Sequence, residues 1–564
     1  MNKLLQYERM LPVREKVMSL SEIDITKIED ENMRQLVGGL LNIIENLSAD
    51  VRRLQDENQR LRDENNHLKG EQGKPDIKAK KSAPDHSSED ERRQPRKHQK
   101  KSKRAKIKID REEIVQVDRA ILPPDADFKG YEEVVVQEIV LHTDNISFLK
   151  EKFHSASEGK TYLAQLPSGY VGTFGPNLRA QVITLYYVCQ MTEPKMHAYL
   201  TQIGIDISVG TISNMLIKGH EQFHKEEADG YQASLEGSPW QQIDDTGTRV
   251  NGDNHYCHIV DSPLATHYKT TSSKNRLNVI NVLSNGMVQG FRCNEQALQI
   301  MKSLKTPQYA LKKLEQLFSN QDYDQDFMDN WLSDNLPRLN DQQHGTILSS
   351  MAIAAYHAQD DYPVVKLLVC DNAGQFKCVT YELSLCWIHE GRHYKKLSPV
   401  IPYHQKLQQR FLGAFWKFYH HLNSYRDKPT LEKAAWLERY FDRLFATRTG
   451  YDELDKLIAR TQSKKRPLLM VLIHPEIPLH NNSAELGARQ RVRKRKISFG
   501  PRVKDGVQAW DTFMSLVATT RKLGVNFHDY ILDRIMGASC IPPLPDLIEA
   551  QAQHLNLGTS WQEI

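Results

Sequence analysis

The sequence of 564 residues contains no run of about 18 apolar residues, and its seven cysteines include no Cys-x-x-Cys pair. The first absence argues against a transmembrane helix, and the second argues against a zinc ribbon or a redox dithiol. Arg and Glu interrupt the N-terminal apolar residues, so no secretory signal peptide and no membrane association are expected. An odd cysteine count fits a reducing compartment, and we expect a cytoplasmic protein.

Net charge says little, because Lys and Arg exceed Asp and Glu by only four. The distribution is more informative: residues 92–108 read RRQPRKHQKKSKRAKIK, a basic block with almost nothing to bury. We expect a disordered arm that neutralises DNA phosphates. The alternative is a solvated linker. A second basic cluster, at residues 489–496, favours the DNA interpretation.

A heptad pattern precedes this arm. Apolar residues and two asparagines alternate spacings of three and four, which predicts a parallel coiled-coil dimer. The alternative is a helix packed within its own chain, which the polar remainder of the segment disfavours. The seam consists of Val37, Leu40, Ile44, Leu47, Val51, Leu54, Asn58, Leu61, Asn65 and Leu68.

The region after the arm gives weaker signals. Residues 131–141 alternate as a strand would, and residues 160–166 could pair with them. Three short helical patterns follow at 176–188, 194–200 and 208–216, typical of a helix-turn-helix. Three such helices also pack with no ligand. If the third helix reads DNA, its exposed small polar residues are the contacts: Ser208, Thr211 and Asn214.

Two aspartates follow strand-like sequences. Asp244 ends Trp-Gln-Gln-Ile and precedes a hairpin whose turn contains Asn251-Gly252, a pair that accepts positive φ angles. Asp371 ends the apolar run of residues 364–370, which reads as a strand buried on both faces. Both aspartates are therefore expected at strand ends, at the edge of a central sheet. An aspartate in that position is often only a turn former.

A third acid, Glu485, is expected near the start of a helix, because Asn482 is a good N-cap. Taken alone, a glutamate three residues after an N-cap indicates a capping box. The alternative is a metal site shared with the two aspartates. Cleaving or joining a phosphodiester can use two Mg²⁺ ions about 3.5–4 Å apart, held by carboxylates from several elements.

The surroundings of the acids resemble the DDE transposases of the insertion-sequence sixty-six type. Asp244-Asp245-Thr246 is similar to the family's Asp-Glu-Thr motif, with Asp245 in place of Glu. The stretch from Cys386 to His389, Cys-Trp-Ile-His, is similar to Cys-Trp-Ala-His, and basic residues follow it. Residues 479–485 are similar to Leu-Asp-Asn-Asn-x-x-Glu, and an Arg normally follows. The resemblance runs from about residue 180 to the end, and the chain departs from it at Asp245, His480 and Leu486.

The resemblance implies a transposase that cuts element ends and transfers strands to target DNA. An active site of Asp244, Asp371 and Glu485 would hold two Mg²⁺ ions, or Mn²⁺ in their place. Many family members have what looks like a small zinc-binding module in the region of residues 109–176, but this region contains no cysteine here, so no zinc is expected. Double-stranded DNA, a second copy of the chain and companion proteins of the same element would be its partners, on the bacterial nucleoid. The implied phosphate contacts are Arg392, Arg489, Arg495 and Lys496.

The expected fold is α/β, with an RNase H-like catalytic core. The alternative function is a catalytically inactive DNA-binding regulator, and an oligomeric scaffold would leave the basic clusters unexplained. The expected organisation is an N-terminal segment at 1–32, a coiled coil at 33–70, a basic linker at 71–110, a small β module at 111–175, a helix-turn-helix-like region at 176–235, a core at 236–505 with helical insertions near 294–360 and 400–475, and a C-terminal helical segment at 506–564.

Overall fold

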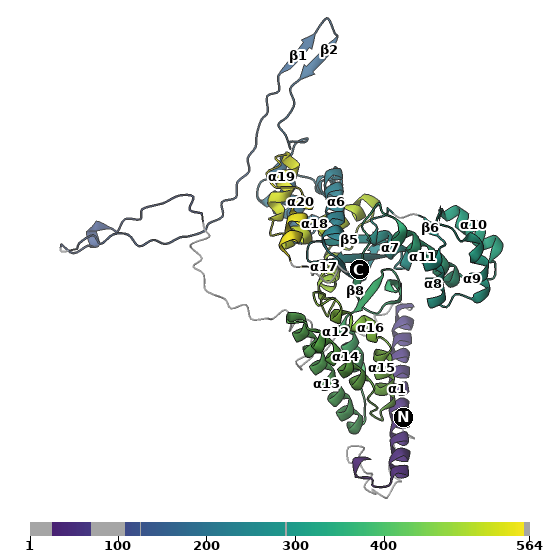
Figure 1. Cartoon of the computed structure of the whole chain (residues 1–564). Coiled ribbons are helices and arrows are strands. Elements are labelled where there is room, and N and C mark those ends of the chain that lie inside the picture. Colours follow the sequence, from purple (N-terminus) through teal and green to yellow (C-terminus); the bar gives the residue numbers. More distant parts are fainter. Residues whose placement is uncertain (1–24, 69–107, 125, 288–289, 556, 558–564) are drawn as a thin grey trace, which may run out of the picture. The chain divides into compact units, whose positions relative to one another are not determined.

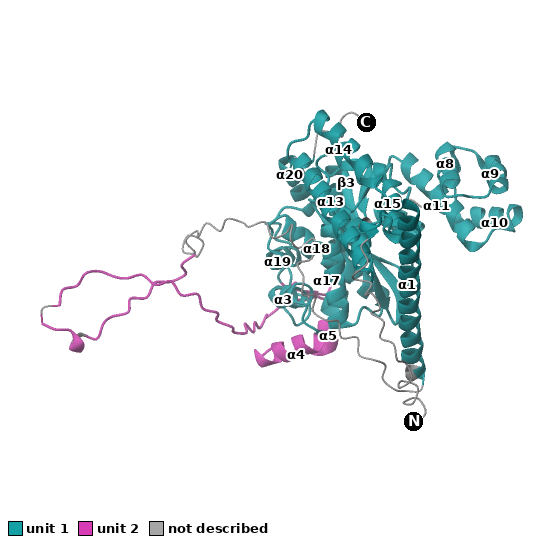
Figure 2. Ribbon diagram, turned by 90° about the horizontal axis from the view of Figure 1, so that it is seen from below, with its two compact units in different colours: residues 1–83, 167–192, 213–564 teal, residues 84–166, 193–212 magenta. Residues whose placement is uncertain are grey.

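The computed structural model describes residues 25–68, 108–124, 126–287, 290–555 and 557. The chain forms two compact units of mixed α/β structure, each considered by itself (Figure 2). The first comprises residues 1–83, 167–192 and 213–564, and the second comprises residues 84–166 and 193–212. Most of the basic arm, residues 92–107, lies outside the described residues.

A five-stranded sheet organises the first unit, in the order β5-β4-β3-β8-β9. The first three strands are antiparallel neighbours, whereas β3, β8 and β9 run parallel. Residues 240–250 and 253–261 form the hairpin around Asn251 and Gly252, both at positive φ as that turn requires. The bounds are β3 Trp240–Val250, β4 Asp253–Asp261, β5 Thr266–Thr271, β8 Leu367–Cys370 and β9 Glu382–Leu385.

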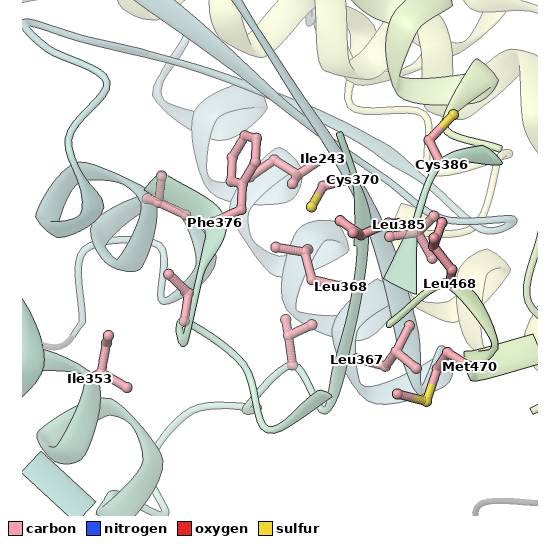
Figure 3. Packing of buried hydrophobic residues seen from close by; sticks show 14 of the residues in the cluster. Ile243, Ile353, Leu367, Leu368, Cys370, Phe376, Leu385, Cys386, Leu468 and Met470 are labelled. Carbon is pink, nitrogen blue, oxygen red and sulfur yellow. The ribbon is translucent and has the colours of Figure 1, made fainter. Parts of the chain in front are cut away.

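Strand β8 lies inside the core, as its apolar sequence predicts. All four of its residues are buried, and Ile243 of β3 belongs to the same cluster (Figure 3). A strand that is buried on both faces needs no alternation of polar and apolar residues.

Helices from several parts of the chain surround this sheet. Helix α17 packs along β3 and β4, and α18 packs on β5. Gly487 of α17 permits this approach, because a Cβ there would lie 2.7 Å from the side chain of Ile259. The helices are α3 Pro176–Tyr187, α6 Glu221–Gly237, α7 Arg276–Leu283, α17 Asn482–Ser498, α18 Lys504–Lys522, α19 Phe527–Met536 and α20 Leu544–His554.

Two helical segments interrupt the sheet connections (Figure 1). The first joins β5 to β8 and occupies the position where the sequence predicts an insertion. Its elements are β6 Phe291–Arg292, α8 Glu295–Ser303, α9 Gln308–Leu314, β7 Asp322–Tyr323, α10 Gln325–Asn335 and α11 Asp341–Ala358. The second follows β9 and consists of α12 Trp387–Lys396, α13 Pro402–Asp427, α14 Leu431–Phe445, α15 Asp452–Gln462 and α16 Lys465–Leu468.

The heptad segment forms one helix, α1 Glu31–Leu68, but it also packs within its own chain. Leu41 is 2% exposed and forms a cluster with Ile25 and Ile401. The buried carboxylate of Glu45 accepts hydrogen bonds from the backbone N–H groups of Val400 and Ile401, at 2.6 and 3.1 Å. Both alternatives for this helix are therefore compatible, because Val37 of the heptad seam packs against this cluster whereas Leu40 and Leu47 are exposed.

The second unit contains a hairpin of β1 Lys152–Ser155 and β2 Lys160–Leu163. The strand predicted over residues 131–141 is wrong, because that stretch has no ladder partner. Residues 160–163 pair instead with 152–155, where a short turn closes the strands at a lower entropic cost than a long loop. Helix α4 Glu193–Gln202 also lies in this unit, and α5 Val209–Ile217 runs from it into the first.

Among the described residues, no helix is both long enough and apolar enough to cross a membrane.

Candidate active site

The two predicted aspartates lie on neighbouring parallel strands. Asp371 follows β8 directly, as predicted. Asp244 is not at a strand end, because β3 continues unbroken to Val250 as one arm of the long hairpin. Pairing between β3 and β8 nevertheless stops at Gln242 opposite Val369. Asp244 and Asp371 are each two residues beyond that pair, so both lie where the two strands separate.

Glu485 lies in the first turn of α17, and the predicted capping box is not formed. The N-cap is Asn481 rather than Asn482, and its side chain makes no capping bond. The amide of Asn481 instead donates to the carbonyl of Ile243 at 2.6 Å, directly before Asp244. This bond ties the start of α17 to the part of β3 that carries Asp244.

Gln242 supplies the cap that the helix lacks. Its side-chain oxygen accepts from the N–H groups of Ser483 and Ala484, at 3.2 and 3.4 Å. These are first-turn donors that have no partner inside the helix. No local sequence pattern indicates this role, because the capping residue lies 241 positions before Ser483, on β3. Gln242 and Asn481 together fix Glu485 relative to Asp244.

The three acids interact electrostatically. Burial, and after it the negative charges of Glu485 and Asp371, raise the pKa of Asp244 from 3.8 to about 7, while the hydrogen bond from the N–H of Asp245 opposes the shift. Such a site favours either a bound proton or a cation. A cation near Asp244 would relieve both the desolvation and the mutual repulsion.

Glu485 is surrounded by basic side chains. Its Oε1 lies 3.5 Å from Nδ1 of His389, and its Oε2 lies 3.4 Å from Arg392 and 3.9 Å from Arg489. Arg392 also donates to Nε2 of His389 at 3.0 Å. Burial lowers the pKa of His389, so the imidazole is neutral at pH 7. From the sequence, His389 was identified only as the last residue of the Cys-Trp-Ile-His motif and was not predicted to contact Glu485.

A groove of about 410 Å³ opens along β3, α12 and α17. The structure brings Asp244, Glu485 and Arg489 together there, whereas Asp371 is not among the lining residues. Arg493, one turn beyond Arg489, belongs to the basic cluster at residues 489–496 but is not among the predicted phosphate contacts. The lining residues are Asp244, Asp245, Thr246, His389, Glu485, Ala488, Arg489, Val492 and Arg493.

The basic cluster of α17 has two different roles. Arg491 and Lys494 are buried: Arg491 pairs with Asp511 at 3.2 Å, and Lys494 donates to the carbonyl of Tyr186 at 2.7 Å. These two residues join α17 to α18 and α3. Arg489 and Lys496 are exposed, so they can meet DNA.

Arg495 lies beside the hairpin. One of its guanidinium nitrogens is 4.0 Å from the position that a Cβ would take on Gly247. Asp245 also lines the groove, but its carboxylate has other partners: its Oδ2 accepts from Gln375 at 2.6 Å, and its Oδ1 is 3.7 Å from Nζ of Lys274. Asp245 therefore links β3 to the loop after β8.

The donor set fits hard divalent cations. Glu485 Oε1 is buried without a hydrogen-bond partner among the described residues, and it faces the groove that Asp244 lines. Cys386, His389 and Glu485 form one described set whose donor atoms lie within 4.8 Å of one another. Burial raises the pKa of the Cys386 thiol to about 12, so that sulfur is protonated and a poor ligand. Carboxylate oxygens remain the available ligands.

Of the expected base-reading residues, Thr211 and Asn214 lie on α5, and Ser208 directly precedes it. The Ser208 hydroxyl accepts from the N–H of Thr211 at 3.1 Å and contacts its hydroxyl at 2.9 Å, which is an N-terminal cap. Asn214, further along the same helix, is exposed.

Comparison with known proteins shows extensive similarity. A family model described as "Transposase IS66 family" matches residues 171–292 and 350–509, together half of the chain. The unmatched interval between them contains α8, α9 and α10. An uncharacterized protein, y4jO, from Sinorhizobium fredii (strain NBRC 101917 / NGR234) is 33% identical over 321 residues, which cover 57% of this chain and 99% of that protein.

Proposed function

Because the chain belongs to the IS66 transposase family, we propose that it cleaves DNA at the ends of an insertion element and joins the freed 3′ ends to target DNA. Asp244, Asp371 and Glu485 would bind two Mg²⁺ ions, with Mn²⁺ as a substitute. The reaction proceeds without a covalent protein–DNA intermediate. It takes place on nucleoid DNA in the bacterial cytoplasm.

The observation that carries this proposal is the raised pKa of Asp244, about 7, caused by burial and by the two other acids. Three carboxylates from β3, the end of β8 and the first turn of α17 share one electrostatic environment. Structural aspartates at turns are normally solvated, and their carboxylates do not repel one another. A site that repels its own charges is stabilised by divalent cations.

The sheet supports an RNase H-like core. Its three antiparallel strands continue into two parallel strands, and the first two acids lie where β3 and β8 separate. Binding sites in α/β sheets commonly lie beyond the carboxyl ends of parallel strands. Helix α17 would bring the third acid across this edge.

Each group has a definable part in the chemistry. Two bound divalent cations would make a water or a 3′-hydroxyl nucleophilic and neutralise the leaving oxygen. The acids orient the reacting groups, and Gln242 and Asn481 hold Glu485 at its position. Arg392 and Arg489 approach Glu485 in the absence of DNA and would turn to the scissile phosphate. Arg495 and Lys496 would hold the backbone further along the groove.

Dimerisation through α1 fits the need to hold two element ends. Docking of Leu41 and Glu45 leaves the heptad seam open, with Leu47 60% and Leu54 59% exposed. Apolar residues at heptad spacing on an open face favour a partner helix of the same kind. A second copy of α1 meets that requirement.

End recognition is proposed for α5. Ser208 and Thr211 begin the helix, and Asn214 lies one turn further on, so these residues would enter the major groove. The basic arm would add affinity that does not depend on sequence.

The decisive experiment measures magnesium-dependent cleavage of a labelled duplex carrying the element's own terminal sequence. Wild type, Asp371→Asn and Glu485→Gln would be compared, with Asp253→Asn at the hairpin turn as a matched control. We expect cleavage by wild type and the control only, with DNA binding retained in all four. Binding without cleavage in every protein, with companion proteins present, would overturn the proposal in favour of the regulator.

A further inference from the structure

Helix α13 carries an unusual charge pattern. In its 26 residues, PYHQKLQQRFLGAFWKFYHHLNSYRD, the one acid is the last residue, Asp427. Lys406, Arg410 and Lys417 are all exposed. They are spaced by four and seven residues, which places them on one face of the helix. A solvated helix face commonly mixes charges of both signs, and this face does not.

The three cations also lack the partners that neighbouring cations have. No ion pair joins Lys406, Arg410 or Lys417 to a described residue. By contrast, Lys456 of α15 lies 2.7 Å from Glu453, and Lys465 of α16 lies 2.8 Å from a carboxylate of α14. Arg439 and Arg443 of α14 likewise have no ion pair to a described residue. Helix α14 nevertheless contains Glu432, Glu438 and Asp442, whereas the α13 face carries no acid from Lys406 to Lys417.

A glycine lies in the middle of this face. Gly413 is exposed between Arg410 and Lys417, and a Cβ added there would meet no atom within 4 Å. Packing therefore does not explain it, and its φ is not positive. Glycine inside a helix lowers helix stability relative to alanine. A bare backbone at this position leaves room for close approach by another molecule.

We propose that this face, defined by Lys406, Arg410, Gly413 and Lys417, binds the phosphate backbone of duplex DNA outside the catalytic groove. From Lys406 to Lys417 the helix rises about 16 Å, whereas phosphates of one strand follow about every 3.4 Å along the duplex axis. The face can therefore cross several phosphates.

The composition of the face distinguishes DNA from a protein partner. Its other exposed residues are Gln405, Gln409 and His420, and no exposed residue of the helix is apolar. Protein interfaces need an apolar centre, whereas phosphate contacts use cations and polar donors. This inference rests on the proposed function, since the DNA bound here would be the DNA that the groove cuts or joins.

The test uses the full chain with a 30-base-pair duplex of unrelated sequence and one carrying the element end. The variant combines Lys406→Gln, Arg410→Gln and Lys417→Gln. A control removes the same charge at the paired cations Lys456, Lys465 and Arg466. We expect the variant to bind both duplexes at least about tenfold more weakly than wild type, with a salt dependence of log K shallower by up to about 2.7. The control should change neither.

Gly413→Ala provides a second, independent measurement. The added methyl group should raise Tm by about 1–2 °C, yet weaken DNA binding about threefold, a combination that misfolding cannot produce. If wild type binds DNA and the triple variant matches it in affinity and salt dependence, the α13 site is refuted while the proposed function stands. If wild type neither binds nor cuts duplex DNA, the proposed function fails and this inference fails with it.

Discussion

Nδ1 of His389 lies 3.5 Å from Oε1 of Glu485, and the opposite ring nitrogen accepts a hydrogen bond from Arg392. Arg392 can only donate, so Nε2 must carry the lone pair and Nδ1 must carry the proton. The proton therefore points at Glu485. A shift of a few tenths of an ångström would make this contact a hydrogen bond that orients the carboxylate.

His389→Asn should consequently be tolerated better than His389→Gln. The Asn amide can occupy the position of Nδ1–H, whereas the Gln amide reaches the position of Nε2. Loss of an orienting partner around a metal ligand commonly costs about 10–100-fold in metal affinity or activity. Mn²⁺ binding followed by electron paramagnetic resonance, beside cleavage assays, would test this. Equal Mn²⁺ affinity in both variants and wild type would show that His389 does not position the carboxylate of Glu485.

The strand pattern could be predicted from the sequence because it depends on local composition, whereas the three acids were singled out only by their joint context and the family resemblance, and their role stays a prediction. An apolar run ending in Asp371 reads as a buried strand whatever surrounds it. The contacts that position Glu485 could not be predicted, since Gln242 and Asn481 act across about 240 residues. No local periodicity encodes such a pair.

The sequence also did not show which cations of the basic run in α17 are buried and which face solvent. Arg491 and Lys494 sit in the same basic run as Arg489, yet they are buried against Asp511 and Tyr186. Helical spacing separates the two sets, but it does not show which face meets the protein. In α1, the heptad pattern is stronger than the pattern of the face that docks through Leu41. The docked face was therefore not predicted from the sequence.

Neighbouring Asp244 and Asp245 should respond differently to substitution. Asp244→Asn removes an acid from the coupled site, and cleavage should fall below detection. Asp245→Asn keeps its shape and a bond to Gln375 after an amide flip, so cleavage should stay within about tenfold of wild type. Single-turnover cleavage at saturating DNA would compare them. Loss of all cleavage in Asp245→Asn, with folding intact, would mean that the second aspartate is the ligand.

Substitutions at two leucines of α1 should distinguish the docking of α1 on its own chain from dimerisation through the heptad seam. Leu47→Asp places a charge in the open seam, so it should shift a dimer to a monomer without lowering Tm of the core. Leu41→Ala leaves a cavity beneath the docked face and should cost about 2 kcal/mol locally, releasing α1 from residues 400–401 while the dimer persists. Light scattering gives the mass, and hydrogen exchange at Ile401 reports the release. A monomeric wild-type protein at micromolar concentration would contradict the seam assignment.

His357 should make the unfolding free energy depend on pH. Its Nε2 donates to the carbonyl of Val379 at 2.9 Å, and its Nδ1 contacts the amide of Gln296 at 2.7 Å, an arrangement that suits the neutral ring. Burial lowers the pKa of His357 from 6.5 to about 4, with the Val379 bond opposing the shift.

Between pH 6.5 and 4 the unfolded chain therefore binds more protons at this position than the folded chain. The stabilisation is fully present above about pH 6.5 and is lost as the pH falls toward 4, by up to about 3 kcal/mol. His357→Gln keeps a donor toward Val379 and cannot titrate. Urea denaturation of both proteins from pH 7 to pH 4 should show the gap between their unfolding free energies narrowing or reversing as acid is added. A gap independent of pH would mean that His357 is accommodated equally well when protonated.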